Sequence, residues 1–222
     1  TKLGGRISFE SRIGRGSSFM VHLPVTGEDS TRIRFVHNGS RQQKDDTFYL
    51  QRKVLVGEKG YMEETIHRKE DEWAFHVIAY KGIQPVGTVS CISRESMGYL
   101  PLENNFDITS HLNGKPAAEI DRLAVLKEER GSMVPLGLMT LAYIFAKAKG
   151  AEKIFLDVFA DEKKHIKMYE KLGFQVIGEY SAPLPVTVMM LDHKSDYEKT
   201  ERMNSFVRPF LSRLETRLEF EG

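Results

Sequence analysis

The chain has 222 residues, and its 32 Lys and Arg against 31 Asp and Glu leave a formal net charge of +1. This length accommodates one ordinary domain, or one domain with a small appendage, and excludes large multi-domain assemblies. The balanced charge gives no basic face of the kind that marks nucleic-acid-binding proteins, so we expect no nucleic acid as a partner.

Cysteine usage and hydropathy indicate where the chain works. Its one cysteine, Cys91, cannot form an internal disulfide. The sequence shows neither the pattern of a secretory signal nor an 18-residue apolar run, so we expect no integral membrane span. These features are typical of a protein of the reducing cytoplasm.

Residues 1–30 are predicted to form a β-hairpin followed by a linker. Apolar residues alternate from Ile7 to Phe9 and from Phe19 to Leu23, around a Gly14-Arg15-Gly16 turn. The Gly-Gly-x-Ile strand, the Gly-x-Gly turn and the Phe-x-Val-x-Leu-Pro strand resemble the end of a histidine-kinase ATP-binding domain. The motifs that hold ATP in that family are not found here, so the resemblance implies a remnant without kinase activity.

Residues 31–192 show a mixed β/α order. Runs of β-branched and apolar residues predict strands, and apolar residues spaced three and four apart predict helices. The predicted strands are 33–36, 73–80, 85–92, 118–125, 154–159, 174–177 and 186–191, and the predicted helices are 46–64, 135–149 and 163–171. Between them, residues 93–117 look irregular, and a loop of this length suggests a substrate wall.

The tail, residues 193–222, is predicted to be an amphipathic helix. Phe206, Phe210, Leu211, Leu214 and Leu218 follow helical spacing. Its apolar face can pack on the same chain or on a second copy, which leaves a homodimer open.

The order from Leu123 to Phe174 resembles the GNAT acyltransferase fold. That resemblance implies an α/β (α+β) domain with a mixed central sheet flanked by helices. In the family, the loop before the central helix holds a pyrophosphate on backbone N–H groups at the helix N-terminus. Here the loop keeps an Arg and a Gly with altered spacing, and the resemblance assigns binding of the acyl donor and its pantetheine arm to Leu123, Val125, Arg130, Gly131 and Gly137.

Three motifs resemble a narrower branch, the N-acyl amino acid synthases and acyl-homoserine-lactone synthases. They are the stretch 49–61, the Leu-Pro-Leu-Glu at 100–103, and Glu119-Ile-Asp-Arg-Leu-Ala-Val125. The resemblance implies an acyltransferase that joins a long acyl chain, from acyl carrier protein or acyl-CoA, to the amine of an amino acid. Asp121 replaces a Ser of the pattern and Arg52 lies one place late, so simple amide formation is expected over lactone formation.

The chemistry of such a reaction suggests two catalytic residues. Glu119 is predicted to accept the proton of the attacking amine, and a structural ion pair with Arg122 is the alternative. Tyr169 occupies the position where many GNAT enzymes keep an acid for the leaving thiolate, and a packing role beneath the sheet is its alternative.

The acceptor is expected to meet Arg52, Arg122 and His76. Arginine binds carboxylates in bidentate fashion, although surface solvation explains Arg52 and Arg122 equally well. His76 lies in an apolar strand, where a satisfied core histidine is more frequent than a second base.

No set of His, Cys, Asp or Glu has the spacing of metal ligands, and no tightly bound cofactor is expected. Two rival functions remain open. One is an acetyl-CoA-dependent N-acetyltransferase acting on a small amine or protein. The other, of a different class, is a non-catalytic acyl-ligand-binding output module of a sensor histidine kinase.

Overall fold

The structure is a computed structural model that describes residues 6–12, 16–22, 33–37, 39–181 and 184–193. Strands β1 (Arg6–Arg12) and β2 (Gly16–His22) pair as an antiparallel two-stranded sheet, with Phe9 opposite Phe19. The linker and the tail predicted as a helix lie outside the described residues.

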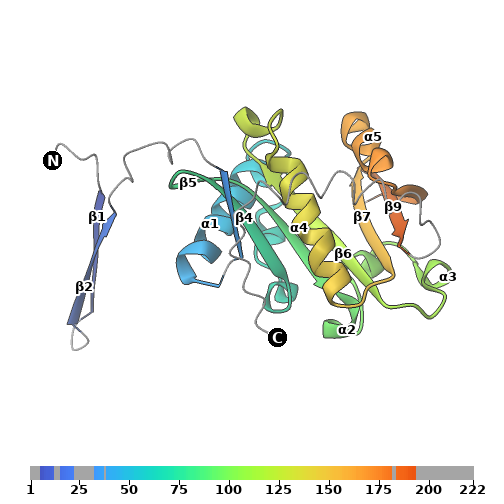
Figure 1. The fold of residues 1–222 in the computed structure, drawn as a ribbon, viewed down its shortest axis with the longest axis horizontal. Coiled ribbons are helices and arrows are strands. Elements are labelled where there is room, and N and C mark those ends of the chain that lie inside the picture. Colours follow the sequence, from blue (N-terminus) through green and yellow to red (C-terminus); the bar gives the residue numbers. More distant parts are fainter. Residues whose placement is uncertain (1–5, 13–15, 23–32, 38, 182–183, 194–222) are drawn as a thin grey trace.

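A seven-stranded mixed sheet forms the centre of the domain. Its order is β3-β4-β5-β6-β7-β9-β8, and only the pair β6–β7 is parallel (Figure 1). The strands are β3 (Ile33–His37), β4 (Phe75–Lys81), β5 (Gln84–Ser93), β6 (Ala117–Val125), β7 (Lys153–Phe159), β8 (Gln175–Ser181) and β9 (Pro185–Asp192). All seven overlap predicted strands, although β8 extends four residues beyond its predicted end at 177, and the expected mixed sheet is confirmed.

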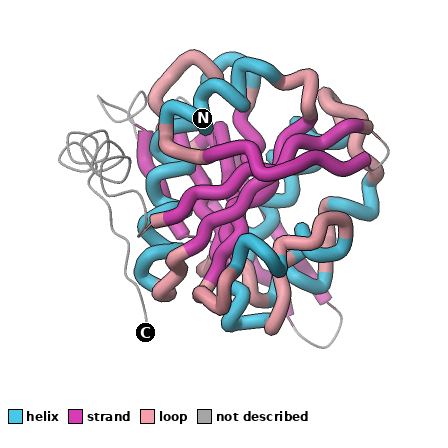
Figure 2. Tube along the Cα trace, turned by 90° about the vertical axis from the view of Figure 1, so that its right-hand side faces the viewer, coloured by secondary structure: helices cyan, strands magenta, loops and turns pink. Residues whose placement is uncertain are grey.

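Helices cover both faces of this sheet (Figure 2). On one face, a Cβ added to Gly87 of β5 would meet Leu138 and Val134 of α4 (Val134–Ala148). Ser90, on the opposite face of β5, lies 3.5 Å from the Gln51 side chain of α1 (Arg41–Gln51). Ile166 and Tyr169 of α5 (Lys163–Lys171) are buried in the same hydrophobic core as α4.

The first helix begins five residues earlier than predicted. Ser40 accepts a hydrogen bond from the Gln43 backbone N–H, and the Gln43 side chain accepts one from the Ser40 N–H. This capping box satisfies two N–H groups that a helix start leaves without partners. The helix then continues as a π-helical turn, Arg52–Val56, and ends before the predicted residue 64.

The stretch predicted as irregular contains three short helical turns. These are α2 (Arg94–Met97), a 3₁₀ turn at Pro101–Asn104, and α3 (Thr109–Leu112). A second apolar cluster holds them against β6, β7 and β9, and its buried members are Ile92, Leu100, Leu102, Ile108, Leu112, Ala117, Phe155 and Val188. Among the described residues, we find no helix with the length and hydropathy needed to cross a membrane.

Candidate active site

The two parallel strands at the centre of the sheet separate partway along. Their ladder joins Ala117–Glu119 of β6 to Lys153–Phe155 of β7. Beyond this point β6 continues to Val125 and β7 to Phe159, and no pairing joins them in this fully described part of the sheet. Each strand therefore presents backbone groups that a third chain or a ligand can bind.

A bulge in β6 redirects its side chains at this separation. Arg122 has φ of +51°, a left-handed conformation that is unusual for an arginine. The pairing of β5 with β6 shifts register here, because Thr88 lies opposite Ala124 while Ser90 lies opposite Asp121. Such strained residues persist where surrounding contacts hold them, and they cluster at functional sites.

Three carboxyl groups gather where the strands part. Glu119 is 4% exposed, and its Oε2 accepts a hydrogen bond from the Leu102 N–H at 2.9 Å. Burial, followed by the charges of Asp121 and Asp157, raises the pKa of Glu119 well above its usual range. Burial also raises the pKa of Asp157, to about 6, although the Tyr180 hydroxyl donates to it at 2.6 Å.

Two arginines balance this negative charge. Arg68 and Arg122 both pair with Asp121, and Arg122 also pairs with Asp71. Burial by itself would raise the pKa of Asp121, but the attraction of Arg68 and Arg122 outweighs this desolvation and leaves the pKa below its usual range. The Nε atoms of Arg68 and Arg122 are buried without a hydrogen-bond partner among the described residues.

Tyr169 of α5 belongs to the same electrostatic neighbourhood. Burial, followed by the charges of Glu162 and Asp157, raises its pKa, so its hydroxyl stays protonated at neutral pH. Asp157 therefore interacts with both predicted catalytic residues, Glu119 and Tyr169. Glu119 and Tyr169 therefore both lie within reach of the Asp157 charge, and the catalytic role of each stays a prediction.

The segment 58–61 contacts elements on both sides of the separated strands. Glu58 pairs with Arg130 in the loop after β6, and Lys59 Nζ lies 2.5 Å from Glu162 Oε1 at the start of α5. The Tyr61 ring lies 5.1 Å, centroid to centroid, from Phe159 at the end of β7. We call Glu58–Tyr61 the strap.

The predicted donor loop is already engaged with the chain's own groups. Arg130 Nε donates to the Val125 carbonyl at 2.9 Å, besides its pair with Glu58. Lys81 Nζ lies 2.6 Å from Glu129. Ser132 Oγ accepts a hydrogen bond from the Val134 N–H, the first of α4. Among the other predicted donor residues, Leu123 is partly buried on β6, a Cβ on Gly131 would meet nothing within 4 Å, and Gly137 is buried inside α4.

His76 lies farther from the carboxyl groups. It faces Ser90 across the β4–β5 pair, and Ser90 faces Asp121, so two strand spacings, roughly 10 Å, separate His76 from Asp121. Its Nδ1 lies 2.8 Å from Ser90 Oγ, and burial together with the Arg122 charge lowers its pKa to about 4. His76 is therefore neutral at pH 7.

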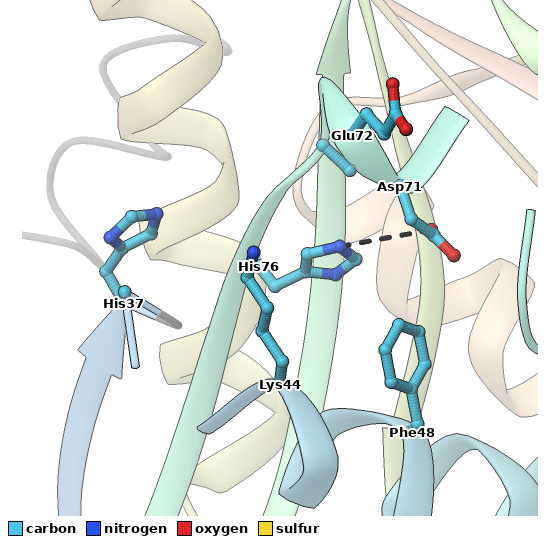
Figure 3. A pocket seen from close by; sticks show the side chains of 8 residues that line it. His37, Lys44, Phe48, Asp71, Glu72 and His76 are labelled. Carbon is cyan, nitrogen blue, oxygen red and sulfur yellow. Dashed lines mark ion pairs between the residues drawn. The ribbon is translucent and has the colours of Figure 1, made fainter. Parts of the chain in front are cut away.

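A pocket of about 400 Å³ opens beside His76 (Figure 3). His76 Nε2 lies 3.9 Å from Asp71 Oδ1, while the Lys44 side chain extends from α1 toward the histidine. The other lining residues are His37, Gly39, Phe48, Glu72 and Ala74. The Arg122–Asp71 pair connects this pocket to the carboxyl cluster.

The structure does not bring Arg52 to the other predicted acceptor residues. Arg52 lies in the π-helical turn, its side chain is 50% exposed, and its Nε pairs with Glu63 at 2.5 Å. The side chain of Arg122 is instead 5% exposed.

Sequence reasoning missed Arg68 and Asp157, and Asp157 carried a signal as the one charged residue within the apolar run 154–159. The described part of the chain contains no group of three or more side chains arranged to hold a metal ion.

A mixed sheet whose central parallel strands separate beside buried carboxyl groups, with helices on both faces, is the fold of the GNAT acyltransferases. A solved N-acyl amino acid synthase, FeeM from uncultured soil microbes, superposes with a TM-score of 0.64 at 19% identity, covering 78% of this chain and 98% of that one. Escherichia coli ElaA gives 0.54 at 18% identity, over 72% and 98%. A NatC complex solved with Gag peptide and CoA gives 0.53 at 17% identity, also over 72% and 98%.

The family model described as N-acyl amino acid synthase FeeM matches residues 47–192, and the chain belongs to this family. The expected GNAT fold and the N-acyltransferase class are thereby confirmed.

Proposed function

We propose that the protein joins a long-chain acyl group, delivered as a thioester on acyl carrier protein or CoA, to the α-amine of an amino acid. The observation that carries this proposal is the buried Glu119 carboxyl at the last paired position of β6, where the β6–β7 ladder ends. Beyond it, around Leu123, β6 is no longer paired with β7, and this edge of its backbone offers hydrogen bonds to the amide groups of a pantetheine arm.

The reaction is a direct attack without an acyl-enzyme. The amine nitrogen forms a bond to the thioester carbonyl carbon, and the carbon–sulfur bond breaks. Glu119 accepts the amine proton, since burial and neighbouring carboxylates raise its pKa and so strengthen it as a base. Tyr169, whose hydroxyl carries a proton at neutral pH, donates that proton to the leaving thiolate.

For the acceptor carboxylate we propose Arg122 together with Arg68. Their buried Nε–H groups make no hydrogen bond among the described residues, although the Arg122 Nε lies 3.7 Å from Asp121, and a bound carboxylate would supply the missing acceptor. The pocket beside His76 is a less suitable place for a compact acceptor, because its amine would remain about two strand spacings from β6, which carries the proposed base Glu119. The exposed Arg52 has no evident role in this arrangement.

The test is acyl transfer measured by mass spectrometry, with acyl carrier protein and CoA thioesters offered against a panel of amino acids. We expect Glu119→Gln to reduce turnover about 10²–10⁴-fold, the usual contribution of a general base. Glu95→Gln, at an exposed position of α2, is the matched control and should retain activity.

Full turnover in Glu119→Gln would exclude Glu119 as the base. Wild-type protein that acetylates amines from acetyl-CoA but makes no long-chain product would favour the acetyltransferase alternative. Ligand binding without any transfer would favour the non-catalytic module.

A further inference from the structure

The charges around the loop before α4 are largely balanced by the chain itself. Arg130 pairs with Glu58, and Lys81 pairs with Glu129. The first N–H of α4 is held by Ser132. A polyphosphate group needs free cations and free backbone N–H groups, and here two of the cations and the first N–H of α4 already have partners.

Arg130 lies where the phosphate end of an acyl donor would arrive. Its Nε binds the carbonyl of Val125, four residues along β6 from Asp121. Strands rise about 3.3 Å per residue, so Val125 is roughly 13 Å from the carboxyl cluster. That separation is comparable to the reach of an extended pantetheine arm, which places the donor's first phosphate close to the Arg130–Glu58 pair.

We propose that Glu58 is a specificity-determining residue, whose carboxylate neutralises Arg130 and so disfavours acyl donors that carry a polyphosphate. This inference rests on the proposed function, because it assumes that a thioester arm binds along β6. CoA brings a pyrophosphate and a further phosphate, and it must compete with Glu58 for Arg130. A phosphopantetheine attached to a carrier protein brings a single phosphodiester and meets less repulsion.

The position of Glu58 favours this role over a purely structural one. The ion pair is partly exposed, with side-chain exposures of 37% for Arg130 and 33% for Glu58. Pairs of this kind contribute little to folding stability, so Glu58→Gln is expected to fold normally. The same exposure allows an incoming anion to reach Arg130.

The experiment measures dissociation constants of CoA and of pantetheine, which lacks phosphate, by calorimetry on the full chain. Glu58→Gln should bind CoA about tenfold more tightly than wild type, the effect expected for one additional charge-assisted hydrogen bond. Its affinity for pantetheine should be unchanged. The gain should decrease as salt is raised, since screening weakens the attraction between Arg130 and phosphate.

Two further variants separate charge competition from loosening of the strap. Lys59→Met breaks the neighbouring pair with Glu162 without freeing Arg130, and it should give no gain in CoA affinity. Adding Arg130→Gln to Glu58→Gln should abolish the gain. An equal gain in Lys59→Met, or equal gains for CoA and pantetheine in Glu58→Gln, would overturn the proposal.

These binding measurements are independent of turnover. Absence of acyl transfer with every thioester would refute the proposed function, whereas an unchanged CoA affinity in Glu58→Gln of an active enzyme would refute only the role of Glu58.

Discussion

Replacing Asp157 by Asn should stabilise the protein at neutral pH. The Asp157 carboxyl is partly buried beside Asp121, and its pKa is raised from 3.8 to about 6, first by desolvation and then by the charge of Asp121. A shift of about two pH units corresponds to about 3 kcal/mol of unfolding free energy. Partial exposure of the residue screens this charge, so we expect a gain of about 1–2 kcal/mol.

The sign of the pH dependence follows from the raised pKa. Between pH 3.8 and 6 the folded protein holds the Asp157 proton more tightly than the unfolded chain does. Wild-type stability therefore falls, relative to Asp157→Asn, as pH rises through this window. The asparagine keeps an oxygen that can accept from the Tyr180 hydroxyl, so the hydrogen bond survives the substitution.

The assay is urea unfolding of both proteins at pH 4, 5, 6 and 7. The difference in unfolding free energy should grow in favour of the variant across that range. Asp107→Asn is the control, because hydrogen bonds from Thr109 lower the pKa of exposed Asp107 from 3.8, so its titration lies below the assayed range and its difference from wild type should change little between pH 4 and 7. A difference between wild type and Asp157→Asn that stays constant with pH would refute the reasoning.

Two further substitutions test the packing and the helix start. Gly178→Ala should lower the free energy of unfolding by about 1–3 kcal/mol, because its Cβ would lie 2.6 Å from the Phe106 ring. The control is Gly39→Ala, whose Cβ would meet nothing within 4 Å, and chemical denaturation should show no such loss for it. Ser40→Ala should cost about 1 kcal/mol by removing the cap of α1, whereas Ser40→Asp should retain most of the stability, and equal losses in the two variants would contradict the capping argument.

The sequence predicted the fold well because the spacing of apolar residues along the chain reflects which side chains of each strand and helix are buried. The strand around Ile120 and the helix 163–171 were predicted within a residue of their observed bounds. The start of α1 was missed although Ser40 and Gln43 form a recognisable capping signature. The π-helical turn at Arg52–Val56 carries no comparable signature in the sequence.

The site was less predictable because its contacts join distant parts of the chain. Arg68 pairs with Asp121 across 53 residues, and nothing near Arg68 indicates that partner. The left-handed backbone at Arg122 is equally hidden, since arginine has no preference for that conformation. Asp157 was easier to recognise from the sequence, because a single carboxylate in an apolar strand usually has a charged partner or a function.

The separation of β6 from β7 also has a mechanical meaning. Four strands on one side and three on the other share one sheet, yet their ladder holds three residue pairs, Ala117 to Glu119 with Lys153 to Phe155. With so short a ladder, the two halves are held together largely by the apolar core to which both contribute, and β6 extends six residues beyond the ladder, roughly 20 Å. An acyl donor bound between β6 and β7 would connect the two halves. We therefore expect the sheet to be most rigid while the donor is bound and to become more flexible as product leaves.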